Sequence, residues 1–218
     1  MPLYTADALI LRTYKLGEAD RIVVFLTRDR GKKRGVAKGA RRQRSKFMGA
    51  LEPLTEVQVA YFERERRELV GLNYAETVRS PLSLFETGGE ALGYVSYFAE
   101  LLDEWAQEAD ADDRLYRLGA SMLDALAAGA PVEPLARYFE YWLLRLQGLY
   151  PESRGTLSDG AMAFLTASRS AVPARVGDLP AERRTLRELE TVHRALISMH
   201  LEKTLKSDRV LRDLRRTP

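Results

Sequence analysis

The spacing of apolar residues changes near residue 80, and this change sets the fold class of the chain. Before that point apolar and polar residues alternate, so that Val57, Val59 and Tyr61 share one face, as in a half-buried strand. After it apolar residues recur at three- and four-residue steps, as in amphipathic helices. The sequence therefore predicts an α+β protein with a β domain at 1–80 followed by an all-α helical domain at 81–218.

The β domain contains five segments with strand character, separated by clusters of turn-forming residues. They span residues 4–13, 21–27, 34–37, 55–62 and 68–78. Five short antiparallel strands are too few for a two-sheet sandwich of immunoglobulin type, whereas a small closed barrel leaves no open sheet edge. The pattern therefore predicts an OB-fold, a five-stranded β-barrel.

The helical domain is expected to contain helices that begin near residues 90, 112, 134, 158 and 181, with a loop at 170–180. Both histidines, His193 and His200, fall within the apolar stripe of the last helix. Because the chain has no cysteine, two histidines supply at most half of a zinc site. We therefore expect them to be core or helix-contact residues.

Positive charge is concentrated between Arg28 and Phe47. The acid in this stretch is Asp29, and the cations are Arg28, Arg30, Lys32, Lys33, Arg34, Lys38, Arg41, Arg42, Arg44 and Lys46. The stretch carries a net charge of +9 in a chain whose formal net charge is +3. Clustered Lys and Arg favour binding to a polyanion, because each neutralised phosphate releases condensed counterions.

A charged run of this kind is also compatible with a disordered arm or a solvated loop. Its setting favours the functional interpretation, because strand-like segments lie on both sides of it. Gly31, Gly35 and Gly39 recur at four-residue intervals, which suits tight turns and close approach of the backbone to a ligand. The run is therefore predicted to be a loop held between strands.

Several classes of function are excluded or disfavoured by the composition. The absence of cysteine rules out disulfides, thiolate metal sites and a thiol nucleophile. The sequence contains no phosphate-binding glycine motif of nucleotide hydrolases, no dinucleotide-binding motif and no nucleophile-elbow motif. It also has no apolar run long enough for a signal segment or a membrane span. These features favour a cytoplasmic, non-enzymatic protein that needs no cofactor.

Three blocks of the N-terminal region closely resemble the RecO family of recombination mediator and DNA repair proteins. They are EADR at residues 18–21, LTRDRG at 26–31 and KGARRQRS at 38–45. Weaker similarity continues through YFEYWLLRLQGLYPE at 138–152 and HLEKTLKSDRVLRDL at 200–214. The resemblance thus extends over nearly the whole chain.

The resemblance implies an OB-fold followed by a helical domain, and a nucleoid-associated protein of DNA repair. It further implies binding of single- and double-stranded DNA, annealing of complementary strands, and association with RecR and single-strand DNA-binding protein so that RecA can load. Many family members carry a four-cysteine zinc knuckle after the segment that matches Gly148 to Pro151. Here that region, near 152–158, lacks cysteine, so the knuckle is expected to be deleted and zinc absent.

The residues expected to contact DNA fall into two groups. The phosphate-binding group is Arg34, Lys38, Arg41, Arg42, Arg44 and Lys46. Tyr14, Phe47 and Phe62 are candidates for stacking on bases, although the barrel core is the alternative for all three and the favoured one for Phe62. Two other functions stay open: an RNA-binding OB protein, and an interaction module whose helical domain is the functional half.

Overall fold

The computed structural model of the 218-residue chain describes residues 2–63, 68–86, 89–151, 157–203, 205–207 and 211. In these ranges the strands are β1 (Leu3–Leu16), β2 (Asp20–Thr27), β3 (Gly31–Ala37), β4 (Glu56–Phe62) and β5 (Val70–Arg79). The helices are α1 (Gly89–Trp105), α2 (Asp113–Ala127), α3 (Val132–Leu146), α4 (Asp159–Ser168) and α5 (Arg183–Leu201). Short 3-10 helices, η1 (Pro81–Glu86) and η2 (Pro173–Asp178), precede α1 and α5. The predicted α+β class with an N-terminal β region is confirmed.

The strands close into a barrel in the order β1, β2, β3, β5, β4, with β4 pairing back to β1. β1 serves both neighbours because its first half pairs with β4, its second half pairs with β2, and the register shifts between Ile10 and Arg12. The barrel differs from the sequence prediction in two respects. β3 begins at Gly31 instead of residue 34. β3 pairs with β5 in parallel, whereas the sequence predicted antiparallel strands.

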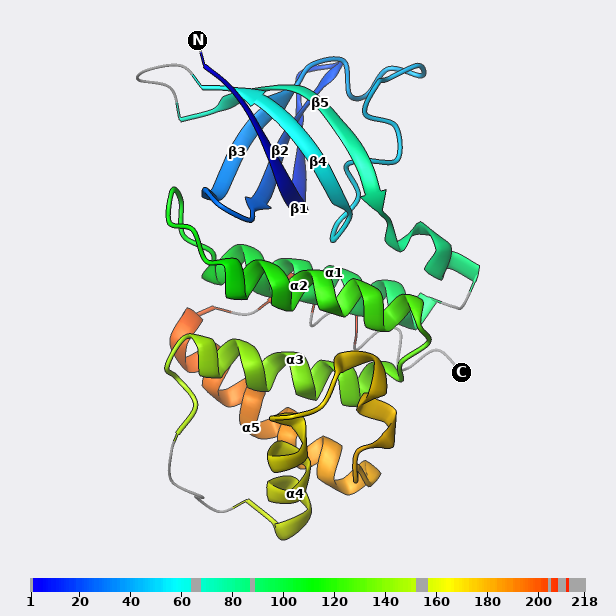
Figure 1. The fold of residues 1–218 in the computed structure, drawn as a ribbon, viewed down its shortest axis with the longest axis vertical. Helices are drawn as coiled ribbons and strands as arrows, with labels where there is room; N and C mark the ends of the chain where they lie inside the picture. The colour runs from blue at the N-terminus through cyan, green and yellow to red at the C-terminus, as the bar shows by residue number, and fades with distance from the viewer. Residues whose placement is uncertain are drawn as a thin grey trace.

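The barrel is filled by aliphatic and aromatic side chains from the inner faces of its strands. Val57, Val59 and Tyr61 are fully buried there, as their alternation predicted. The loop that connects β3 to β4 contributes Phe47 and Leu51 to the same core. This loop leaves β3 at the end of the barrel that is far from the helices and returns along its side (Figure 1).

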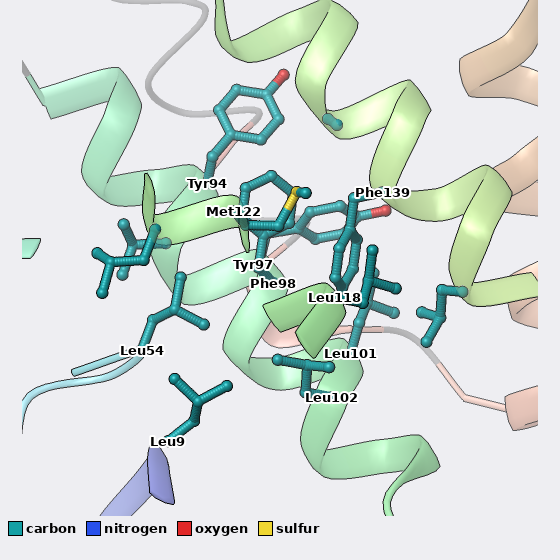
Figure 2. Packing of buried hydrophobic residues seen from close by; sticks show 14 of the residues in the cluster. Leu9, Leu54, Tyr94, Tyr97, Phe98, Leu101, Leu102, Leu118, Met122 and Phe139 are labelled. Carbon is teal, nitrogen blue, oxygen red and sulfur yellow. The ribbon is translucent and has the colours of Figure 1, made fainter. Parts of the chain in front are cut away.

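The helices form layers on one side of the barrel (Figure 1). α1 and α2 lie directly against it, and α3 and α5 lie beneath them. Leu9, Leu11, Val24 and Leu26 belong to β1 and β2 but are buried with the helical residues in one continuous core. Figure 2 shows Leu9 and Leu54 directed toward the cluster around Phe98, Leu102 and Met122. The boundary near residue 80 is therefore a change of secondary structure across a shared core.

Ion pairs surround this apolar contact between barrel and helices. They join Arg12 to Asp103 at 3.2 Å, Arg28 to Asp113 at 2.9 Å and Arg79 to Glu56 and Asp124. The hydroxyl of Tyr116 on α2 donates to Glu56 at 2.7 Å.

No helix in the part of the chain that the structure describes is long and apolar enough to cross a lipid bilayer.

Candidate nucleic-acid interface

The cations in the first half of the basic run, at 28–33, contact other residues of the protein. The pairs are Arg28 with Asp113 at 2.9 Å, Lys32 with Asp103 at 3.4 Å and Lys33 with Glu63 at 2.8 Å. Lys32 also donates to the backbone oxygen of Asp103 at 2.6 Å, and Arg30 stands 4.4 Å above the ring of Tyr4. These contacts link β3 and the β2–β3 turn to neighbouring segments and offset part of the positive charge there.

The second half of the run is left open. Its exposed cations are Lys38, Arg41, Arg42, Arg44 and Lys46, and none of them forms an ion pair within the described ranges. Arg34, on β3, is half-buried and likewise lacks an acid partner among those ranges. We call residues 38–46 the basic loop. Its charge faces solvent, which is the condition that binding to a polyanion requires.

The basic loop is fixed to the turn between β1 and β2. The amide of Gly39 donates to the carboxylate of Asp20 at 2.8 Å, and the amide of Arg41 donates to the carbonyl of Ala19 at 2.9 Å. The Arg41 guanidinium donates to the carbonyl of Gly17 at 2.7 Å. Gly39 has φ +71°, a left-handed conformation that glycine adopts at little cost. The predicted loop held between strands is thus found, in place of a disordered arm.

The three aromatic candidates for base stacking differ in their exposure to solvent. Phe47 is only 2% exposed and packs in the barrel core, so the structure corrects its assignment as a base-stacking residue. Its ring packs in the barrel core, while the ammonium group of its neighbour Lys46 lies 5.3 Å from the centre of the ring. Phe62, at the end of β4, is half-buried. Tyr14 is 42% exposed and is the remaining aromatic candidate near the basic loop.

The two histidines take structural positions, as expected. His193 is fully buried, with Nδ1 2.9 Å from Glu140 and Nε2 3.3 Å from the hydroxyl of Tyr150. His200 stacks on Trp105 with ring centroids 5.6 Å apart. Within the residues described there is no group of three or more His, Asp or Glu side chains arranged to hold a metal ion.

Sequence reasoning missed the acids that neutralise half of the basic run. Asp103 and Asp113 lie far along the chain from their partners Lys32 and Arg28, so no local pattern could have paired them. The deletion of the zinc knuckle was predicted near 152–158, and residues 152–156 of that region lie outside the described residues. Residues 208–210 and 212–218, which include Arg209, Arg212, Arg215 and Arg216, lie outside them as well.

Comparison with known proteins agrees with this architecture. The family profile described as "Recombination protein O N terminal" matches residues 1–81, and the one described as "Recombination protein O C terminal" matches residues 87–155. A protein of Koribacter versatilis named DNA repair protein RecO is 41% identical over 150 residues, which are 69% of this chain and 61% of that relative. The match thus spans less than two thirds of that relative's length.

Other relatives with the same name are matched almost from end to end. The one from Nocardioides is 36% identical over 94% of this chain and 97% of its own length. The one from Pelotomaculum thermopropionicum is 30% identical over 95% and 93%, respectively. Similarity of this extent covers both the barrel and the helices, and the chain belongs to the RecO family.

Proposed function

We propose that this protein is a DNA-binding recombination mediator of DNA repair. In this proposal the basic loop and Arg34 hold the phosphates of single- or double-stranded DNA. The observation that carries the proposal is that the five cations of the basic loop are exposed without an acid partner in the described ranges, whereas Arg28, Lys32 and Lys33 are paired. The names of the relatives, DNA repair protein RecO, support the same class of function.

The proposed activity is annealing of complementary strands, with no catalytic step. Two strands that lie on one cationic surface repel each other less and are locally concentrated, so pairing between them is accelerated. We further propose that the protein acts in the cytoplasm at the nucleoid, with RecR and single-strand DNA-binding protein, so that RecA loads at gaps. The helical domain would serve as scaffold and docking platform.

A salt titration tests the location of the site. The variant Lys38→Gln, Arg42→Gln, Arg44→Gln removes three charges from the basic loop and spares Arg41, whose side chain holds Gly17. The slope of log affinity against log salt is negative, and its magnitude is expected to decrease by about 2 for single strands and about 2.7 for duplex DNA. Strand annealing measured with the same oligonucleotides is expected to slow in parallel.

The matched control removes three exposed arginines from α5, with the variant Arg183→Gln, Arg184→Gln, Arg187→Gln. Because α5 lies on the far side of α1 and α2 from the barrel (Figure 1), this variant is expected to keep the wild-type slope. Equal slopes for the loop variant and the wild type would refute the site. Stronger competition by RNA than by DNA of the same sequence would favour the RNA-binding alternative, and absent affinity for either would favour the protein-interaction alternative.

A further inference from the structure

Three side chains form a row across the outer surface of the barrel, close to the basic loop. Tyr14 of β1 is opposite Ile22 of β2, and Ile22 is opposite Val36 of β3. Directly opposed residues of antiparallel strands point to the same face with about 5 Å between them, so the row is about 10 Å long. Tyr14 is exposed, and Ile22 and Val36 are half-buried. The row is therefore an apolar strip within reach of solvent.

The helices close the same surface immediately beside this row. In the next row Arg12, Val24 and Arg34 are opposed, and Val24 is 4% exposed because it packs into the core shared with the helices. Arg12 is held by Asp103 at 3.2 Å. OB-folds commonly bind oligonucleotides on the face formed by strands 2 and 3. Among the described residues of this face, the row of Tyr14, Ile22 and Val36 at the end near the basic loop remains accessible to solvent.

The charges around the row indicate which kind of ligand can bind there. Arg34 shares the side of β3 that carries Val36 by the two-residue period of a strand, and Lys38 follows in the turn directly after the end of β3 at Ala37. Neither has an acid partner within the described ranges. The guanidinium of Arg12 donates to the Tyr14 hydroxyl at 3.2 Å and so holds the tyrosine ring in place. An apolar strip between unpaired cations is complementary to a strand whose bases are unstacked and whose phosphates are negative.

We propose, on the basis of the DNA-binding function above, that Tyr14, Ile22 and Val36 form a platform for one or two bases of single-stranded DNA. The bases lie against the row while Arg34 and the basic loop hold the adjoining phosphates. A duplex keeps its base faces stacked inside the helix, so it contacts only the cations. The platform therefore gives the protein a preference for single strands that the basic loop by itself does not supply.

Substitution of the tyrosine in the full-length protein tests the platform. Tyr14→Ala is expected to weaken binding of a single-stranded oligonucleotide roughly tenfold and to leave duplex affinity and the salt slope unchanged. Tyr14→Phe keeps the ring and is expected to bind single strands nearly as wild type does. Tyr74→Ala, which removes a tyrosine that is 36% exposed on β5, is the matched control and is expected to change neither affinity.

Photocrosslinking supplies a second readout that does not depend on a variant. An oligonucleotide that carries 5-iododeoxyuridine is expected to crosslink to Tyr14 of the wild-type protein, and crosslinks confined to other residues would overturn the platform. Unchanged single-strand affinity in Tyr14→Ala, or equal losses for single strands and duplex, would overturn it too. In those cases a salt slope of smaller magnitude in the loop variant would still support the proposed DNA-binding function, whereas an unchanged slope would refute that function as well.

Discussion

Glu140 on α3 is a buried acid with partners on three helices. Its carboxylate accepts from the Tyr97 hydroxyl at 2.7 Å, lies 2.9 Å from Nδ1 of His193 and pairs with Arg137 at 2.9 Å. Burial alone would raise the pKa of Glu140, but the charge of Arg137 and the hydrogen bonds from His193 and Tyr97 outweigh it and hold the pKa below its usual range. One side chain thus links α1, α3 and α5.

Glu140→Gln is expected to lower the free energy of unfolding by about 3 kcal/mol at neutral pH, because it removes the nearer countercharge of the buried Arg137 at 2.9 Å and leaves the longer pair with Glu190 at 3.8 Å. The native state has a lowered pKa, so the stabilisation is present above the unfolded-state pKa of about 4.3 and is lost as pH falls through the native value. Urea titrations at pH 7 and pH 3.5 are therefore expected to show a smaller difference between variant and wild type at the lower pH.

Glu76→Gln serves as the control, because Glu76 is exposed on β5 and its replacement is expected to change stability little at either pH. A difference between Glu140→Gln and wild type that stayed constant with pH would show that the ionised carboxylate is not the stabilising species.

At the scale of the elements, β3 depends on a close contact with the segment between α1 and α2. Gly31 opens β3 with φ +67°, and a Cβ atom there would lie 2.5 Å from the backbone oxygen of Asp110. The amide of Lys32 donates to the carbonyl of Gln107 at 3.0 Å in the same contact. The glycine is therefore required both by its backbone conformation and by the approach of another chain segment.

Gly31→Ala is expected to lower the free energy of unfolding by about 3 kcal/mol, since left-handed strain and overpacking add. Gly129→Ala is the matched control, because Gly129 has φ +78° with nothing within 4 Å of the added Cβ, and it is expected to cost about 1 kcal/mol. Denaturant titrations of both variants measure the difference. Equal losses would mean that the contact with Asp110 relaxes freely.

The elements were largely predictable because each has a local signature. The alternation at Val57, Val59 and Tyr61 predicted a strand, and the stripe that contains His193 predicted a buried helix face; both are confirmed. The parallel β3–β5 pairing was not predicted, because pairing depends on how the closed barrel brings distant strands together. Phe47 was misjudged for a similar reason, since its charged sequence neighbours conceal a side chain that the barrel core requires.

The candidate site was predictable only in part. Local composition identified the basic run but could not divide it into paired and unpaired halves. That division depends on Asp103 and Asp113, which the helical domain brings to the barrel from far along the chain. Long-range ion pairs leave no periodic trace in a sequence, whereas the basic loop itself is continuous in the sequence and was found.

For the whole molecule, the shared core predicts that barrel and helices unfold together. Leu26 of β2 is 1% exposed and packs among residues of the helical domain, so a barrel cut off at residue 80 would expose it to water with its apolar neighbours. Leu26→Ala in the full chain is expected to cost about 2 to 5 kcal/mol. Because the lost contact belongs to both parts, hydrogen exchange is expected to quicken by the same factor in the slowest amides of the barrel and of α1.

Leu3→Ala is the control, because Leu3 is 52% exposed and its truncation is expected to leave both sets of amides at their wild-type rates. If Leu26→Ala quickened exchange in the barrel alone, or if the wild type unfolded in two separate transitions, the two parts would be independent folding units. A single transition would instead mean that the basic loop is presented by one cooperative body, so that a substitution in the helical core lowers DNA affinity only through the fraction of unfolded protein.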